Sequence, residues 1–449
     1  MSAAWEERRL HFIGIGGAGM SGLALVAHRL GAAVSGSDRS RSSYLERVER
    51  SGIPVAVGHA GANLPDAAEI VVSTAIPPSN PELSRAREEG RRILHRSDLL
   101  AELCSARRTI AVAGTHGKTT TTGMLAWAMR GLGLDPAFFI GGELPGVGDG
   151  GAAANSGWGS GEWAVVEADE SDGSFLALEP EIAVITNIEM DHHAKWSGLA
   201  ELREAFGSFA GRASKVVEPY GAGSLALPDG GAPQQRIAFD VNRPGPAGVE
   251  LMVPGKHNLL DARAAIAAMV AAGIGEQAAA GALADFPGVK RRLEFKGTCC
   301  GARIYDDYAH HPTEVAASLT ALRELAPERL IAIFQPHLYS RTKAFSLAFG
   351  NALALADEVV VLDVYPAREE PVGPLEGVSG LDVLRAVADR GAATRTWWAP
   401  ELDAAERAAR PLLAPGRIAV TVGAGDVTGL SDRLASPARP PEAMTGKAD

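Results

Sequence analysis

The sequence predicts an α/β protein built from several parallel-sheet units. The chain has 449 residues, of which 46% are apolar, and this is enough for about three domains at roughly 150 residues each. Short apolar runs recur along the chain, and many are followed by a glycine-rich turn and then by a helix-like segment. This alternation is typical of parallel sheets covered by helices, because glycine lets the backbone turn tightly where a strand ends. We therefore expect a three-domain α/β fold.

The expected strands share a short, continuous apolar run, as buried strands of a parallel sheet do. They cover residues 10–15, 33–37 and 70–73 in the first unit, 109–113, 164–168 and 182–186 in the second, and 302–305, 330–334, 359–364 and 418–422 in the third. The expected helices cover residues 20–30, the segment after 118, and residues 313–325.

Domain boundaries are expected near residues 106 and 297. They divide the chain into the ranges 1–106, 107–297 and 298–430, followed by a tail at 431–449. The tail is rich in Ser, Pro, Arg and Lys, and we expect it to be disordered. Segment 219–248 is rich in Gly and Pro and weakly periodic, which predicts a loop with little regular structure.

Charge and cysteine content exclude several classes of function. The chain has 43 Lys and Arg against 54 Asp and Glu, a net charge of -11, and no long basic block. Duplex nucleic acid is therefore not an expected partner, because phosphate binding needs clustered cations. Only three cysteines are present, and no apolar run has the length that a signal peptide or a membrane span needs. We expect a cytoplasmic protein without membrane insertion, as a monomer or a weak homodimer.

A first glycine cluster follows the strand at 10–15 and matches the pattern G-x-G-x-x-G. Its glycines are Gly14, Gly16, Gly17 and Gly19. Backbone N–H groups and the positive end of a helix dipole would face a phosphate there. Asp38 follows the next strand, where an acidic residue can bind a ribose hydroxyl, as in NAD sites. A tight structural turn is the alternative, and the pattern alone leaves the nucleotide open.

A second glycine cluster follows the strand at 109–113 and ends in the Gly-Lys-Thr of a phosphate-binding loop. It consists of Gly114, Thr115, His116, Gly117, Lys118, Thr119 and Thr120. In such loops the backbone N–H groups surround the phosphates, Lys118 would reach the β- and γ-phosphate oxygens, and Thr119 can bind Mg²⁺. Val112 stands where the longer form of the loop has glycine, which argues against an ordinary GTPase. The cluster predicts ATP binding.

Two acidic segments follow later strands of the same unit. One runs from Glu167 to Asp172 and the other from Thr186 to His193. Carboxylates at strand carboxyl ends suit Mg²⁺ beside a phosphate. Some of these side chains are expected to be plain solvated groups, and periodicity does not choose among them. Two phosphate-type loops in one chain favour an ATP-driven enzyme whose other substrate carries a nucleotide diphosphate.

Ten motifs in chain order resemble the Mur ligase family over residues 11–427. They read GIGGAGMSGLA, AGTHGKTTTTGML, EADESDGSF, TNIEMDHH, GKHNLLDA, KRRLEF, DDYAHHPTEV, FQPHLYSRT, LDVYPAREEP and VGAGDV. The resemblance implies a Rossmann-like UDP-binding domain, a central ATPase with a phosphate-binding loop, and a Rossmann-like C-terminal domain. It also implies an ATP- and Mg²⁺-dependent ligase of peptidoglycan synthesis that adds L-alanine to UDP-N-acetylmuramate through an acyl phosphate. The nucleotide at the first glycine cluster would then be UDP and not NAD.

The resemblance further implies roles for individual residues. The residues implied in catalysis are Lys118, Glu167, His192 and His310, and the implied metal ligands are Thr119, Glu167 and His192. Besides the second glycine cluster, the residues implied at the ATP site are His257, Asn258, Asp261, Arg292 and Asp307. Those implied to bind the other substrates are the first glycine cluster with Ser73, Thr74 and Ala75 for the UDP-sugar, and Tyr308 and Arg341, beside His310, for the amino acid.

Structural roles stay open for several of these residues. His257 and Asn258 could cap a helix that begins at Asn258. Arg292 could form an interdomain ion pair. His311, which precedes Pro312, could simply shape a turn. No general base is assigned, with His310 and a bound water as candidates.

Departures from the family pattern leave some functions open. Leu338 stands where family members usually carry a second arginine, which puts strict L-alanine specificity in doubt. Asp261 replaces a usual asparagine, and Trp196 a common tyrosine. The alternatives are a recycling ligase that adds a ready-made tripeptide to the same sugar nucleotide, an inactive nucleotide-binding regulator, and an NAD-dependent oxidoreductase. The segments GIGGAGM and FQPHLYSRT favour the alanine-adding branch, and the intact phosphate-loop residues argue against the regulator.

Overall fold

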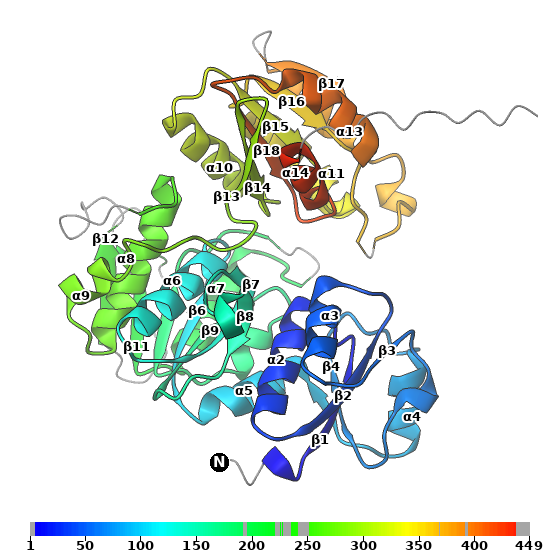
Figure 1. Ribbon diagram of the computed structural model, residues 1–449, viewed down its shortest axis with the longest axis vertical. Helices are drawn as coiled ribbons and strands as arrows, with labels where there is room; N and C mark the ends of the chain where they lie inside the picture. The colour runs from blue at the N-terminus through cyan, green and yellow to red at the C-terminus, as the bar shows by residue number, and fades with distance from the viewer. Residues whose placement is uncertain are drawn as a thin grey trace, which may run out of the picture. The chain divides into compact units, whose positions relative to one another are not determined.

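The computed structural model describes residues 5–191, 195–220, 225, 227, 235–240, 251–367, 369–390 and 394–436. The chain falls into two compact units (Figure 1). The first comprises residues 1–252 and 258–289, and the second comprises 253–257 and 290–449. The first unit contains two sheets and the second contains one.

The first sheet is parallel and has the strand order β3-β2-β1-β4-β5. Its strands are β1 (Arg9–Ile13), β2 (Ala33–Asp38), β3 (Val55–Val57), β4 (Glu69–Val72) and β5 (Ile93–His95). The helices between them are α2 (Ala18–Arg29), α3 (Ser43–Arg50), η1 (Gly61–Asn63), α4 (Pro81–Glu88) and α5 (Arg96–Ser105). The chain order reverses at β1, which is flanked by β2 and β4, and ligands bind at such reversal points in open α/β sheets.

The second sheet has the order β12-β11-β10-β6-β9-β7-β8 and is parallel except for the β7–β8 pair. Its strands are β6 (Arg108–Ala113), β7 (Ala137–Leu144), β8 (Ala154–Gly157), β9 (Trp163–Glu167), β10 (Ile182–Ile185), β11 (Lys215–Tyr220) and β12 (Gln235–Asp240). The associated helices are α6 (Lys118–Gly131), η2 (Asp149–Gly151), η3 (Ser174–Ala177), α7 (Leu199–Ala210), α8 (Lys256–Ala271) and α9 (Glu276–Gly281). Strand β6 lies between β9 and β10, so the segments that follow these three strands meet at one edge.

The third sheet has the order β13-β14-β18-β15-β16-β17, with only β13 antiparallel to its neighbour. Its strands are β13 (Glu294–Cys299), β14 (Ala302–Asp307), β15 (Leu330–Phe334), β16 (Glu358–Val361), β17 (Arg395–Trp398) and β18 (Ile418–Val422). The helices are α10 (Pro312–Glu324), α11 (Tyr339–Leu353), η5 (Gly373–Leu375), α12 (Gly380–Ala388), α13 (Leu402–Ala409), η6 (Arg410–Leu412) and α14 (Thr428–Ala435).

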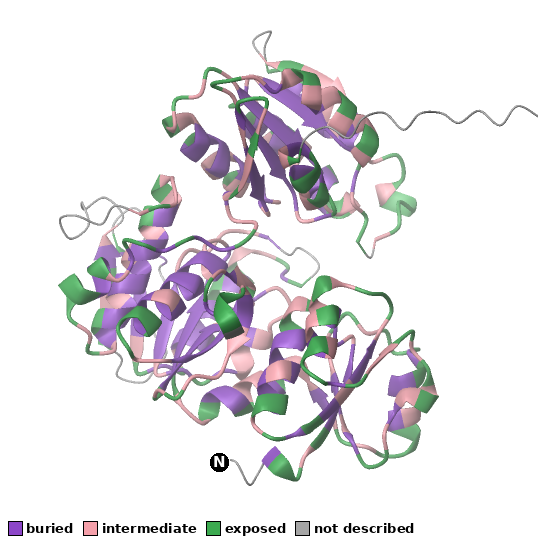
Figure 2. Cartoon of the chain, in the orientation of Figure 1, coloured by how far each residue is buried: buried purple, intermediate pink, exposed green. Residues whose placement is uncertain are grey.

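Local sequence explains where strands and helices begin. The strands at the middle of each sheet are apolar and buried along most of their length, as Figure 2 shows. Ser42 caps α3 by accepting a hydrogen bond from the Leu45 N–H at 3.1 Å. Asn80 caps α4 in the same way, with Pro81 in the first turn.

The three sheets confirm the predicted three-domain α/β fold, with the first two sheets in one compact unit. The predicted strands are also confirmed, with ends that differ by up to three residues. The prediction of a loop over 219–248 is wrong for Gln235–Asp240, which pairs with β11 as the edge strand β12. The predicted tail also begins too early, since α14 continues to Ala435. Residues from 437 onward lie outside the described part, and the exact domain boundaries stay predictions. No helix in the described part is long and apolar enough to cross a bilayer.

Candidate active site

The second glycine cluster connects β6 to α6 in a conformation that requires glycine. Gly114 has a φ of +138°, and a Cβ there would lie 2.0 Å from the Thr186 Oγ1. Gly117 has a φ of +82°, and its Cβ would lie 2.2 Å from an Asp261 carboxylate oxygen. Side chains are excluded at both positions by φ and by space, so the backbone can approach a ligand closely.

Residues after β10 hold the phosphate loop in place. The Asn187 Oδ1 accepts the His116 N–H at 2.9 Å, and the Thr186 hydroxyl donates to the His116 carbonyl at 2.6 Å. The Thr115 hydroxyl donates to the Glu189 carbonyl at 3.0 Å. These contacts fix the loop before any phosphate arrives, which lowers the ordering cost of binding.

Lys118 begins α6 and turns back over the loop. Its ammonium donates to the Gly114 carbonyl at 2.6 Å and forms an ion pair of 2.8 Å with Glu170. Burial lowers the pKa of Lys118, but the charges of Glu170, Asp169 and Glu167 outweigh it and raise the pKa overall. Lys118 therefore keeps its charge, as phosphate binding requires.

Glu170 is a site residue that the sequence did not single out among the acidic run. Its side chain is 1% exposed, and burial raises its pKa to about 7 despite the opposing charge of Lys118. The only sequence feature that points to Glu170 is its place in an acidic run at the end of a strand. An incoming phosphate would compete with Glu170 for Lys118.

Thr119 and Glu167 form an oxygen-rich pair beside Lys118. The Thr119 hydroxyl donates to one Glu167 carboxylate oxygen at 3.0 Å, and the Gly141 N–H donates to the other at 2.6 Å. A hydroxyl and a carboxylate are hard oxygen donors that suit Mg²⁺. His192, the other predicted metal ligand, lies outside the described residues.

The remaining acidic side chains of the run contact Arg96. Asp169 and Asp172 accept from the Arg96 guanidinium at 3.3 and 3.5 Å. Arg96 follows β5 in the first sheet, and one of its nitrogens lies 3.0 Å from where a Cβ on Gly19 would be. These two carboxylates therefore join the two sheets of the first unit.

The first glycine cluster is held by its own neighbours. The Gly16 N–H donates to the Asp38 carboxylate at 2.9 Å, and the Ser42 hydroxyl donates to the Gly16 carbonyl at 3.1 Å. Gly14 has a φ of +82°, and its Cβ would lie 3.1 Å from Ile76 in the turn that follows β4. That turn contains Ser73, Thr74 and Ala75, so the structure brings it beside the glycine cluster as the parallel pairing of β1 and β4 requires.

Asn155 connects the first glycine cluster to the second sheet. It is 2% exposed, and its amide donates to the Ala18 carbonyl in the first turn of α2 at 2.6 Å. Its oxygen accepts from Arg47 at 3.2 Å, and Arg47 also forms an ion pair with Glu143. No sequence pattern predicts this contact, because Asn155 and Ala18 lie 137 positions apart.

In the second unit, Asp307 ends β14 and holds the neighbouring backbone. It accepts the Ala309 N–H at 2.7 Å, the Leu293 N–H at 3.0 Å and the Ser318 hydroxyl at 3.1 Å. Burial raises its pKa to about 6. These bonds engage both carboxylate oxygens and fix the backbone around the carboxyl end of β14.

Arg292 and His310 both lie beside Tyr308. The Arg292 guanidinium lies 5.2 Å from the Tyr308 ring centre, in cation–π range. The His310 Nδ1 lies 3.0 Å from the Tyr308 carbonyl oxygen, and the two rings meet edge to face at 5.3 Å. The structure thus gathers three predicted site residues at the carboxyl end of β14.

Arg341 lies in the first turn of α11 and is 7% exposed. Its guanidinium lies 3.3 Å from the His337 Nδ1, and the His337 ring stacks on Tyr365 at 5.8 Å. Leu338, at the unusual position, has a φ of +69° just before the helix. Positive φ values are uncommon for residues other than glycine.

The structure decides two of the alternative roles. Helix α8 begins at Lys256, so Asn258 is not where the helix starts, and a cap at that point is wrong. His311 does cap α10, where its ring nitrogen accepts the Thr313 N–H at 3.4 Å. Burial and the charge of Arg292 lower the pKa of His257 to about 4, so the imidazole is neutral at pH 7.

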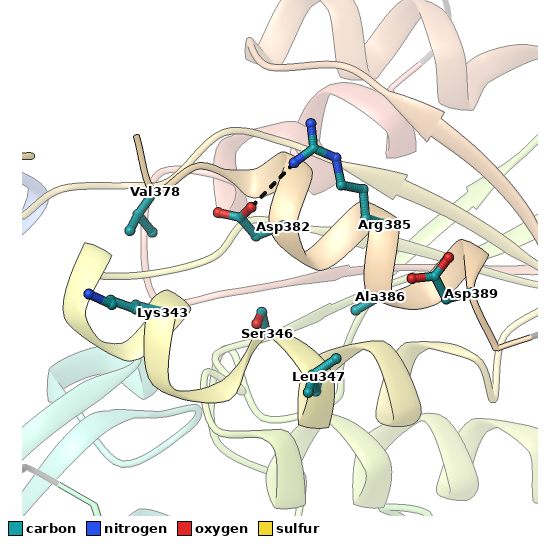
Figure 3. Close-up of a pocket in the computed structure, with 8 residues that line it drawn as sticks. All are labelled: Lys343, Ser346, Leu347, Val378, Asp382, Arg385, Ala386 and Asp389. Carbon is teal, nitrogen blue, oxygen red and sulfur yellow. Dashed lines mark ion pairs between the residues drawn. The ribbon is translucent and has the colours of Figure 1, made fainter. Parts of the chain in front are cut away.

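Two surface hollows contain none of the predicted site residues. A groove of about 330 Å³ runs between α11 and α12 and is lined by Lys343, Leu347, Asp382 and Arg385 among others (Figure 3). A larger hollow of about 770 Å³ lies beside Trp127 at the end of α6.

The fold and the phosphate loop define a P-loop nucleotide-binding protein of the α/β class. Three family models match the chain: "Mur ligase family, catalytic domain" at residues 9–108, "Mur ligase middle domain" at 112–216, and "Mur ligase, glutamate ligase domain" at 291–425. The chain belongs to the Mur ligase family.

Two curated relatives that match nearly the full length of the chain carry the same name. The UDP-N-acetylmuramate–L-alanine ligase of Renibacterium salmoninarum is 44% identical, with 96% of this chain and 97% of the relative covered. That of Thermobifida fusca is 42% identical, with 95% and 96% covered.

Solved structures agree with the fold. The UDP-N-acetylmuramate–alanine ligase of Thermotoga maritima is 29% identical with a TM-score of 0.79, covering 95% of this chain and 98% of that one. A murein peptide ligase from Psychrobacter arcticus is 26% identical with a TM-score of 0.68 and the same coverage.

Proposed function

We propose that this protein joins L-alanine to UDP-N-acetylmuramate and converts ATP to ADP and phosphate. The observation that carries the proposal is that one compact unit contains both glycine clusters: the phosphate loop of the second sheet, and the first glycine cluster, which Asn155 and Arg96 connect to that sheet. The names of the full-length relatives support the same substrates. The product, UDP-N-acetylmuramoyl-L-alanine, is a peptidoglycan precursor, which fits a cytoplasmic enzyme, as a monomer or weak homodimer, that serves cell-wall growth, cell shape and division.

The proposed chemistry activates a carboxylate and then forms an amide. A lactyl carboxylate oxygen attacks the γ-phosphorus of ATP, the bond to the β-phosphate oxygen breaks, and ADP leaves. The alanine amine attacks the acyl phosphate carbonyl, loses a proton, and expels phosphate. Both steps bring anions together, so a fixed cation such as Lys118 at the γ-phosphate stabilises the transition state.

Magnesium fits the pair formed by Thr119 and Glu167, and His192 is proposed for a second ion. A bound Mg²⁺ supplies positive charge that offsets the repulsion between phosphate and carboxylate. Thr119 and Glu167 would orient their oxygens toward it, and the hydrogen bond from the Gly141 N–H holds the Glu167 carboxylate in place.

Further residues, beyond the phosphate loop, are proposed to bind the nucleotide. These residues are His257, Asn258, Asp261, Arg292 and Asp307. Support comes from Asp261, which borders the phosphate loop at Gly117, and from His257, whose neutral ring suits a base better than a phosphate.

The amino acid is proposed to bind at Tyr308, His310 and Arg341. Arg341→Ala is expected to raise the KM for L-alanine by roughly 10- to 100-fold, the value of one or two charge-assisted hydrogen bonds to a carboxylate. Steady-state kinetics at saturating ATP and UDP-sugar measure this. Lys343→Ala removes an exposed cation from the same helix and should leave the KM unchanged. An equal rise in the KM for L-alanine in both variants would contradict the placement of Arg341 at the amino-acid site.

The UDP-sugar is proposed to lie along the first glycine cluster and the turn at Ser73, Thr74 and Ala75. Asn155→Ala is expected to raise the KM for the UDP-sugar several-fold with little change in the KM for ATP, because the Ala18 carbonyl loses its buried donor. Calorimetric binding of the UDP-sugar alone checks this. A larger effect on ATP than on the sugar would contradict it.

A phosphate-release assay tests the function as a whole. Release is expected only when ATP, UDP-N-acetylmuramate and an amino acid are all present, with no change in nicotinamide absorbance. Comparing L-alanine, glycine, L-serine and a tripeptide determines whether Leu338 has altered the preference. Activity with the tripeptide alone would favour the recycling reaction, and binding of both nucleotides without ADP formation would overturn the proposal.

A further inference from the structure

Two adjacent cysteines form the tip of the β13–β14 hairpin. Cys299 pairs with Ala302, so Cys300 and Gly301 are the two turn residues. Their φ values are +52° and +79°, as a tight two-residue hairpin turn requires. Cys300 is exposed and Cys299 is half-buried, and their sulfurs lie 3.7 Å apart. The turn thus presents two thiols side by side at the surface.

The sulfur separation suits a shared ligand better than a disulfide. A disulfide needs a bond of about 2.05 Å and usually Cα atoms at least ~4.4 Å apart, whereas neighbouring Cα atoms are only ~3.8 Å apart. A single soft atom about 2.3 Å from each sulfur would instead subtend an angle of about 107°, close to tetrahedral, at the observed separation of 3.7 Å. The geometry therefore favours two bonds to one thiophilic centre.

The surroundings limit which thiophilic centre fits. In the part of the chain that the structure describes, no group of three close His, Cys, Asp or Glu side chains includes either cysteine. A four-coordinate metal would lack protein ligands, but a monosubstituted trivalent arsenic compound needs only two sulfurs, because its organic group is the third substituent.

The third cysteine, Cys104, serves as an unreactive comparison for the pair. Cys104 lies in the core of the first unit, and burial raises its pKa to about 12. Thiols react as thiolates, so Cys104 is inert. Burial and Cys300 also raise the pKa of Cys299, with Arg410 opposing the rise. We therefore expect the exposed Cys300 to react first with a thiophilic reagent. Cys299 then forms the second bond to the same atom.

We propose that Cys299 and Cys300 form a dithiol site that captures trivalent arsenic compounds of the type R–As=O. Each thiol hydrogen is lost, two As–S bonds form, the As=O bond breaks, and one water leaves, with no change in oxidation state. The site lies at the amino end of β14, about 17 Å along the strand from Asp307 at roughly 3.3 Å per residue.

Phenylarsine oxide with the reduced full-length protein tests this site. Intact mass spectrometry is expected to show one phenylarsenic group per chain, stable to a monothiol and removed by a dithiol. Cys299→Ser and Cys300→Ser should each abolish the monothiol-resistant adduct, whereas Cys104→Ala should keep it. Cys300 is exposed and Cys299 is half-buried, so circular dichroism is used to verify that both serine variants fold. No stable adduct on the parent protein, or an adduct that survives Cys300→Ser, would overturn the proposal.

Discussion

Lys118→Ala is expected to lower kcat by about 10³-fold or more, while binding of the UDP-sugar stays intact. The ammonium lies over the phosphate loop, in contact with the Gly114 carbonyl and Glu170, and burial excludes water that could replace its charge. The side chain does not contact the first glycine cluster in any of the bonds described above. Phosphate release measures kcat, and calorimetry measures UDP-sugar affinity.

Two further variants test whether the loss of turnover is specific to Lys118, rather than a result of removing any lysine from this sheet. Lys215→Ala removes a lysine from β11 of the same sheet, where it donates to the Ala271 carbonyl, and should retain turnover. Glu170→Gln removes the carboxylate that competes with phosphate for Lys118, so we expect a lower KM for ATP at similar kcat. Turnover of Lys118→Ala within tenfold of the parent would refute the phosphate-loop assignment.

The glycine clusters could be predicted from sequence because their geometry is local. A strand, a tight turn and a helix follow one another within a few residues. Each can be recognised by its residue types: an apolar run, then glycines, then a helix-like segment. The edge strand β12 lacks a clear strand pattern in the sequence. It lies at the sheet edge and buries little beyond Phe239, so it needs no continuous apolar run. Its neighbours in the chain are rich in Gly and Pro, and these residues dominated the prediction of a loop.

Partners that are far apart in the chain could not be predicted. The acidic run offers four similar carboxylates, and only the packing of β6 against β9 decides that Glu167 meets Thr119 while Glu170 meets Lys118. Asn155 has no motif at all, because its role depends on α2 packing against β8. The sequence pattern suggests a ribose contact for Asp38, and this stays a prediction. The structure shows that the Asp38 carboxylate accepts the Gly16 N–H, a contact that no sequence pattern predicts.

Glu82 carries a buried charge that the proposed reaction does not use. It is 0% exposed on α4, and its carboxylate accepts the Ser37 hydroxyl and the Asn63 amide, both at 2.6 Å. It also accepts the Ala60 N–H at 3.1 Å and lies 3.3 Å from the His11 ring. Burial alone would raise the pKa of Glu82, but these bonds lower it from 4.5 to about 2. The network joins β1, β2 and α4 and thus supports the sheet that holds the first glycine cluster.

Glu82→Ala is expected to destabilise the first domain by about 3–5 kcal/mol, as removal of one partner from a buried charged network does. Because the folded pKa of Glu82 is depressed, its contribution is fully present above about pH 5 and is lost as the pH falls from 4.5 toward 2. Glu82→Gln should therefore lose stability at pH 7, and its deficit relative to the parent should shrink in acid. Hydrogen exchange of peptides from residues 9–105 measures this domain separately, and Glu88→Gln, an exposed change on the same helix, is the control. If the deficit of Glu82→Gln did not change between pH 7 and pH 3, the carboxylate charge would not be what stabilises this network.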